Sequence, residues 1–195
     1  MSAEAPTGVL ALQGAFALHQ KVLESLGERV VQVRRPEQLE GLARLVVPGG
    51  ESTTMSMLAE RSGLLAPLAD FAAEGRPVLG TCAGAILLSG EILDGRSDQR
   101  CLGAIDIVTR RNGFGRQVDS FSEPIDVAGL DSPFNAVCIR APVIEQVGDG
   151  VEVLAELDGQ PALVAEGAIM VSIFHPELAE DPRVHRLFLQ RGPSG

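Results

Sequence analysis

Cys82 stands between two glycines in the run Gly80-Thr-Cys-Ala-Gly84, inside an uncharged stretch at residues 77–90. A Gly-x-Cys-x-Gly pattern is typical of a nucleophile elbow, in which a strand turns sharply into a helix and presents a reactive side chain at the turn. The N-terminus of such a helix favours the thiolate, which is the nucleophilic form of cysteine. Because cysteine is also a common core residue, a buried structural thiol is the alternative interpretation.

His175 and Glu177 form a second candidate group, directly after an apolar run that ends at Phe174. Pro176 disfavours helical geometry at His175, and side chains two residues apart on an extended backbone point the same way. The carboxylate can then hold one ring nitrogen and leave the other free to exchange a proton with a nucleophile. A histidine that merely ends a strand is the alternative until Cys82 is considered with it.

Two loops carry groups that bind anions. Gly49 and Gly50 follow the apolar run 45–47, where backbone N–H groups can turn outward, and Ser52 or Thr53 can cap the next helix. The loop 110–117 holds three arginines and two glycines. Since arginine donates bidentately to carboxylates, this loop is either a substrate clamp or a solvated turn, and the Gly49-Gly50 turn has the same ordinary alternative.

The elements that must position these residues alternate between strands and helices in the first half of the chain. We expect strands at 8–12, 29–34, 45–47 and 78–79, and helices at 15–26, 36–42 and 64–74. This order predicts a mostly parallel sheet with helices on both faces. Any site is then expected at the carboxyl ends of the strands, where Gly50 and Cys82 both fall.

Shorter strand-like runs follow residue 90, at 102–109, 136–140, 151–156, 161–164 and 168–174. We expect them to form an antiparallel or mixed extension of the same sheet. The chain has 195 residues without repeats or a linker, so we expect one domain, residues 1–195. The predicted fold class is therefore α/β, with a mixed, mostly parallel sheet.

Charge and composition exclude several classes of function. The net charge of −10 argues against a nucleic-acid surface, which needs clustered lysine and arginine. The apolar run 77–90 is too short to cross a bilayer and the first residues are unlike a signal peptide, so we expect no membrane association and a cytoplasmic protein. Three cysteines without a closely spaced pair predict reduced thiols and no metal site, and no cofactor is expected.

The two other histidines are weaker candidates. His19 borders the apolar stripe of the helix 15–26, and we interpret it first as a packed or capping residue, with a functional role as the alternative. His185 lies in a short terminal helix between arginines, and we expect it on the surface.

Three segments together resemble the class I (triad) glutamine amidotransferases: Pro48-Gly-Gly-Glu-Ser52, Gly80-Thr-Cys-Ala-Gly84 and Phe174-His-Pro-Glu-Leu178. Four further segments are similar to the glutaminase subunits of pyridoxal 5'-phosphate synthase: residues 12–14, 49–54, 111–121 and 139–142. The similarity covers about residues 8–190 and leaves 1–7 and 191–195 as tails.

The resemblance implies a flavodoxin-like core and hydrolysis of L-glutamine to L-glutamate and ammonia through a cysteine thioester. Cys82 would be the nucleophile, His175 the acid and base, and Glu177 the group that orients His175. The oxyanion donors would be the N–H groups of Gly50 and Ala83. The glutamine site would be lined by Gly50, Glu51, Ser52, Arg111, Ile139 and Arg140. Which arginine pairs the α-carboxylate of the substrate stays open.

The resemblance also implies a partner, because ammonia released into water becomes mostly ammonium, which is not nucleophilic. That partner is a barrel-fold synthase subunit, in a hetero-oligomer that builds pyridoxal 5'-phosphate. We expect Gln13 and His19, near the end of the first strand, at the contact. The alternatives are a cysteine-elbow protein of the DJ-1 or peptidase type, which does not predict the late His-Pro-Glu segment, and a scaffold whose triad-like residues are structural.

Overall fold

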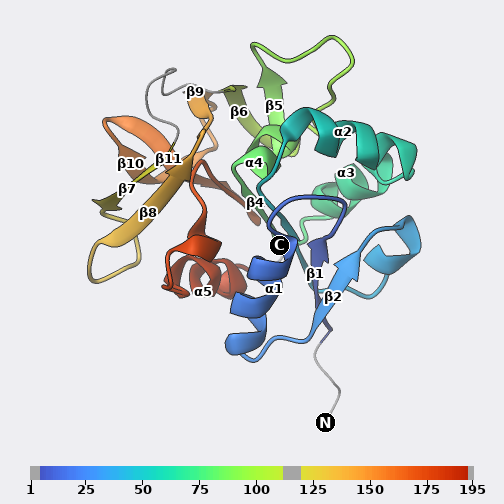
Figure 1. Ribbon diagram of the computed structural model, residues 1–195, viewed down its shortest axis with the longest axis horizontal. Helices are drawn as coiled ribbons and strands as arrows, with labels where there is room; N and C mark the ends of the chain where they lie inside the picture. Colours follow the sequence, from blue (N-terminus) through green and yellow to red (C-terminus); the bar gives the residue numbers. More distant parts are fainter. Residues whose placement is uncertain (1–4, 112–119, 193–195) are drawn as a thin grey trace.

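A seven-stranded sheet with the strand order β10-β11-β12-β4-β3-β1-β2 forms the centre of the molecule (Figure 1). The computed structural model of the chain describes residues 5–111 and 120–192. Five adjacent strands run parallel, and the predicted α/β class with a mostly parallel sheet is confirmed. These strands are β1 (Thr7–Leu10), β2 (Val30–Val33), β3 (Arg44–Val47), β4 (Val78–Thr81) and β12 (Ile169–Ser172).

Helices cover both faces of this sheet because its crossovers run in opposite directions. One connection, α1 (Phe16–Ser25), leads from β1 outward to β2, whereas α2 (Ser52–Arg61) and α3 (Leu65–Ala73) lead from β3 the other way to β4. Right-handed crossovers of opposite direction put their helices on opposite faces.

The remaining helices join these two layers. The C-terminal helix α5 (Arg183–Gln190) lies beside α1, and α4 (Ala83–Leu88) packs against α2 (Figure 1). Two short 3-10 helices, η1 (Pro36–Leu39) and η2 (Pro176–Leu178), complete the set, and η1 is shorter than the predicted helix 36–42. Within the described residues, no helix has both the length and the apolar character that crossing a bilayer requires.

The central strands are apolar on both faces because helices cover both faces. Every residue of β1, β4 and β12 is buried. The largest fully buried side chains include Phe134, Phe174 and Phe188. Replacing such a buried ring by alanine costs about 3–5 kcal/mol, so these side chains stabilise the layers on which the site is built.

The second half of the chain departs from the predicted single sheet. The antiparallel strands β10 (Glu152–Leu157) and β11 (Gln160–Glu166) extend the central sheet as expected. However, β5 (Ser89–Ile92), β6 (Ile105–Arg110) and β9 (Val143–Val147) form a separate three-stranded sheet. In the described part of the chain, β7 (Ser120–Ile125) and β8 (Phe134–Ile139) form a two-stranded sheet of their own. The prediction of one continuous sheet is wrong here, and β5, β7 and β9 were not predicted as strands. Local alternation indicates a strand but does not indicate its partner.

Two glycines allow α4 to pack directly on the strand ends. A Cβ on Gly84 would overlap the carbonyl oxygen of Val47 and lie 2.8 Å from its carbon. A Cβ on Gly80 would lie 2.9 Å from the carbonyl of Gly84. Both neighbours are backbone atoms, which cannot rotate away, so neither position has room for a side chain.

We expect Gly84→Ala to lower the free energy of unfolding by about 1–3 kcal/mol, the usual cost of overpacking a site that cannot expand. Urea denaturation at neutral pH measures this change. Gly90→Ala is the matched control, because a Cβ there would meet its nearest atom at 3.5 Å, an ordinary contact. Equal stability of the two variants would contradict the close approach of α4 to β3.

Candidate active site

Cys82 lies at the turn between β4 and α4. Its backbone has a φ of +48° and a ψ of −103°, a conformation that costs a non-glycine residue about 1–3 kcal/mol. This strained strand-turn-helix geometry is the predicted elbow. The residue is only 6% exposed, and its sulfur lies 3.9 Å from the carbonyl oxygen of Ile139, so the thiol sits at the base of a pocket.

His175 and Glu177 follow β12, the strand beside β4. The register aligns Ser172 with Thr81, and the N–H of Cys82 donates to the carbonyl of Ser172 at 2.8 Å. Nδ1 of His175 lies 2.8 Å from Oε1 of Glu177, so the pair expected from the His-Pro-Glu spacing is formed. Both side chains are buried.

The imidazole of His175 and the side chain of Cys82 meet over Gly49. A Cβ on Gly49 would overlap Cε1 of His175 and lie 3.4 Å from Cβ of Cys82. The ends of β3, β4 and β12 therefore converge within a few ångströms, and only glycine fits between them.

Opposing effects set the protonation of this pair. Burial lowers the pKa of His175, but hydrogen bonds to Cys82 and Glu177 outweigh burial and raise the pKa to about 10. Burial raises the pKa of Glu177, but the hydrogen bond from His175 contributes to lowering it below its usual value. An imidazolium and a carboxylate are thus paired beside Cys82 at neutral pH.

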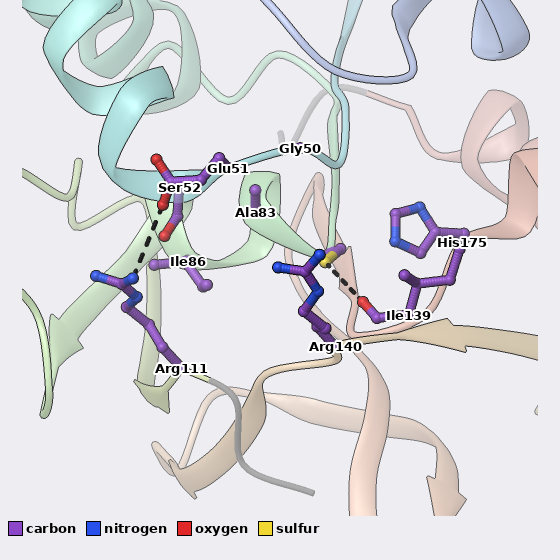
Figure 2. Close-up of a pocket in the computed structure, with 10 residues that line it drawn as sticks. Gly50, Glu51, Ser52, Ala83, Ile86, Arg111, Ile139, Arg140 and His175 are labelled. Atoms are coloured by element: carbon purple, nitrogen blue, oxygen red, sulfur yellow. Dashed lines mark hydrogen bonds and ion pairs between the residues drawn. The ribbon is translucent and has the colours of Figure 1, made fainter. Parts of the chain in front are cut away.

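A pocket of about 460 Å³ opens at Cys82 (Figure 2). Every residue predicted for the substrate or as an oxyanion donor lines it, whereas Glu177 lies behind His175. Ile86 was missed as a lining residue because its apolar run indicated only a core position. The lining consists of Gly50, Glu51, Ser52, Cys82, Ala83, Ile86, Arg111, Ile139, Arg140 and His175.

The loop after β3 is held by its own side chains. The carboxylate of Glu51 caps α2, accepting from the N–H groups of Thr53 at 3.2 Å and Thr54 at 2.7 Å. The prediction that Ser52 or Thr53 caps this helix is wrong, because the helix begins at Ser52 and Glu51 is long enough to reach back to its N–H groups.

Gln13 fixes the same loop from the end of β1. Its amide nitrogen donates to the carbonyl of Glu51 at 3.0 Å, and its amide oxygen accepts from the N–H of Glu51 at 3.2 Å. The carbonyl of Gly49 accepts from the N–H of Ala15 at 3.1 Å, which leaves the N–H of Gly50 on the opposite side of the trans peptide. Gln13 stays partly exposed, so its predicted contact with a partner stays a prediction.

The two arginines of the pocket are held differently (Figure 2). Nη1 of Arg111 donates to Oγ1 of Thr53 at 3.0 Å and to Oε1 of Gln99 at 3.1 Å, and Nη2 lies 3.8 Å from Glu51. Arg140 adopts a φ of +43°, and its guanidinium has no hydrogen bond or ion pair with any of the described residues. Among the described residues, Arg140 is therefore the arginine of this pocket whose guanidinium has no partner and can receive an anionic ligand.

Gln99, in the connection between β5 and β6, completes the network and was not predicted. Its amide nitrogen donates to Oγ of Ser52 at 3.1 Å, and its amide oxygen also accepts from Thr53 at 3.2 Å. No sequence pattern around Gln99 predicts these contacts, because a loop residue meets its partners only when the chain has folded. The rest of the predicted anion-binding loop, residues 112–119, lies outside the described residues.

His19 and His185 are both fully buried, and this corrects two predictions. His185 is not on the surface, because α5 lies against α1, where its Nε2 is 2.9 Å from Nδ1 of His19. A side chain without exposed area cannot touch a partner, so His19 is withdrawn from the predicted contact, and its interpretation as a packed residue holds. Burial lowers the pKa of His19 to about 4 and that of His185 to about 3.

Comparison with known proteins gives close relatives. The model of the SNO glutamine amidotransferase family matches residues 9–192. The "Pyridoxal 5'-phosphate synthase subunit PdxT" of Corynebacterium jeikeium is 54% identical over 184 residues, 94% of either chain. The subunit of the same name from Deinococcus radiodurans is 55% identical over 185 residues, 93% of this chain and 94% of its own.

Solved structures agree with this similarity. A crystal structure of a glutamine amidotransferase has a TM-score of 0.89 and 50% identity, and the match covers 94% of this chain and 97% of that one. PurLQS from Thermotoga maritima shares the fold at a TM-score of 0.70 and 17% identity, with 96% of this chain and 98% of that chain covered.

The buried histidines predict that stability falls as the pH is lowered from 7 to 4. The unfolded chain protonates them near pH 6.5, whereas the folded chain resists protonation until about pH 4, so acid favours unfolding. For His19 alone the loss is on the order of 3 kcal/mol. The lowered pKa of Glu177 acts in the same direction.

Urea denaturation across pH 4–9 measures this profile. His185→Gln should flatten the acid side. By contrast, His175→Gln should flatten the alkaline side of the stability profile. The raised pKa of His175 contributes stability below pH 6.5, and this stability is lost toward pH 10. An acid side that keeps its slope without His185 would refute this explanation.

Proposed function

The chain belongs to the SNO glutamine amidotransferase family, and on that premise we propose that it hydrolyses L-glutamine to L-glutamate and ammonia as the glutaminase subunit of a pyridoxal 5'-phosphate synthase. One observation carries the proposal. A cysteine at a strained elbow shares a pocket with a histidine whose far nitrogen is bonded to a buried carboxylate, as nucleophilic amide hydrolysis requires.

In the proposed first half-reaction, the Cys82 thiolate attacks the side-chain amide carbon of glutamine. The C=O electron pair moves onto oxygen, and the oxyanion accepts hydrogen bonds from the N–H groups of Gly50 and Ala83, each such donor contributing about 3–4 kcal/mol. His175 gives its proton to the amide nitrogen, the C–N bond breaks, and ammonia leaves. A thioester between the glutamyl carbon and the sulfur remains.

In the second half-reaction, neutral His175 takes a proton from water while the water oxygen attacks the thioester carbon. The C–S bond then breaks, glutamate leaves, and the thiolate–imidazolium pair is restored. Glu177 keeps the Nδ1 proton of His175 in place through both halves, so that Nε2 is the nitrogen that exchanges protons.

Arg140 is the proposed partner of the substrate's α-carboxylate. Its guanidinium is open among the described residues, whereas that of Arg111 is already bonded to Thr53 and Gln99. We assign Arg111 to shaping the wall of the pocket, where its bonds support the first turn of α2, including Ser52.

The proposed partner is a barrel-fold synthase subunit that consumes the ammonia within a hetero-oligomer. Relatives more than 50% identical are named as synthase subunits, and ammonia lost to water would be protonated to ammonium. Gln13 is the residue that we propose for the contact, since it is partly exposed and bonded to the pocket loop. We also propose that the protein works in the cytoplasm, where Cys82 stays reduced.

Replacement of Cys82 by alanine should abolish glutaminase activity, with a loss of at least about a thousandfold, because the variant lacks the sulfur on which the proposed thioester forms. Glutamate release is measured with and without the synthase subunit, and the wild type should depend largely on it. Cys101→Ser is the matched control and should keep its activity, since Cys101 lies outside the pocket. Substantial activity of Cys82→Ala would reject the mechanism.

The Arg140→Ala variant should raise the KM for glutamine about 10–100-fold with little change in kcat, because a charge-assisted hydrogen bond contributes about 1.5–3 kcal/mol to binding. Arg140→Lys should recover part of the loss. Arg111→Ala should raise KM less. The assignment fails if Arg140→Ala leaves KM unchanged in steady-state kinetics of the complex.

A further inference from the structure

A row of buried polar side chains continues from Glu177 away from the pocket. Nε2 of His19 lies 3.2 Å from Oε2 of Glu177 and 3.1 Å from Oγ1 of Thr81, and Nδ1 of His19 lies 2.9 Å from Nε2 of His185. His19, Thr81 and His185 have no exposed surface. They come from α1, β4 and α5, so the fold, not one local segment, assembles the row. None of the proposed chemical steps uses these three residues.

The second carboxylate oxygen of Glu177 depends on His19. Oε1 accepts a hydrogen bond from His175, whereas Oε2 has no well-directed hydrogen bond from any of the described residues. The nitrogen that approaches Oε2 is Nε2 of His19. A buried ionised oxygen without a donor is costly, so a proton on this nitrogen stabilises the carboxylate.

The neighbours of His19 select its tautomer. With the proton on Nδ1, the lone pair of Nε2 would face the carboxylate at 3.2 Å, and the two negative regions would repel. With the proton on Nε2, this N–H donates to Oγ1 of Thr81 with Oε2 of Glu177 3.2 Å from the nitrogen, and Nδ1 accepts from the Nε2–H of His185. Nδ1 of His185 has no hydrogen-bond partner in the described part of the chain, and the row ends there.

We propose that His19 is a positioning residue for the amide hydrolysis: the positive end of its Nε2–H dipole lies beside the second oxygen of Glu177 and restrains it electrostatically, and His185 fixes the tautomer that makes this possible. This inference rests on the proposed function. A carboxylate held at one oxygen can rotate about its last bond, whereas one held at both oxygens fixes the orientation of the His175 ring. His19 acts only through Glu177, since it does not line the pocket.

His19 and His185 are neutral at working pH because both are buried. His19 faces Glu177 and His175 from the segment after β12, His185 from α5, and the Thr81 hydroxyl from β4. Burial lowers the pKa of His19 to about 4 against the opposing charge of Glu177, and burial also lowers that of His185 to about 3. His19 therefore donates as a neutral imidazole and does not compete with His175 for the catalytic proton.

Two amide variants separate the role of Nε2 from that of Nδ1. His19→Gln places an N–H near the position of Nε2, whereas His19→Asn places it near that of Nδ1 and leaves Oε2 of Glu177 without an N–H beside it. For the complex with the synthase subunit, we expect His19→Asn to lower kcat about tenfold or more and to change KM less than about twofold. The acid limb of the pH profile of kcat for this variant should move to higher pH by about one pH unit. His19→Gln should keep most of the activity, and Lys21→Asn, on the exposed face of α1, is the matched control.

Alkylation of Cys82 by iodoacetamide, followed across pH by peptide mass mapping, gives a second readout that needs no glutamine. The same upward shift of the acid limb is expected for His19→Asn. If the wild-type complex lacks glutaminase activity that depends on Cys82, the proposed function fails, while the alkylation profile still decides the role of His19. If His19→Asn shows the same pH profile of alkylation as the wild type, the inference is overturned.

Urea denaturation shows whether His19→Asn is folded. If it is not, His185→Phe is the deciding variant, because it removes the donor to Nδ1 and leaves His19 in place. A smaller shift of the acid limb in the same direction supports the inference, and an unshifted limb overturns it.

Discussion

The parallel pairing of β4 with β3 on one side and β12 on the other is the constraint on which the site depends. The register sets Val47 beside Gly80 and Ser172 beside Thr81. Since parallel strands end at the same edge of a sheet, the three loops that follow emerge together. Close backbone packing at Gly49 and at the elbow glycines then turns this adjacency into contact. A slip of one residue would reverse the face of every side chain at the strand ends.

The first half of the fold was predictable because its signals are local. Buried apolar runs bounded by glycine marked β1, β3 and β4, and a helical stripe marked α1 and α3. In the second half, β6, β8, β10, β11 and β12 were predicted as strands without their partners, and β5, β7 and β9 were not predicted. Charged side chains such as Glu91, Glu123 and Glu145 interrupt β5, β7 and β9, and the partner of each strand is set by contacts distant in sequence. The separate three-stranded sheet follows from those contacts and from no local pattern.

The candidate site divides along the same line. Cys82, His175 and Glu177 could be predicted because the glycines beside Cys82 and the proline beside His175 indicate the local backbone geometry. Gln99 and His185 could not be found in this way, since their partners lie on other elements. His19 was assigned to a surface from its nearness to a strand end, although its place beside an apolar stripe already indicated burial.

The position of β12 has a consequence for the growing polypeptide. Among the described strands it is the last to be synthesised, yet it lies between β4 and β11 inside the sheet. Until it inserts, β4 presents an unpaired edge, and the sulfur at its end has no imidazole beside it. Insertion of β12 is therefore needed both to close the sheet beside β4 and to bring the imidazole to the thiol.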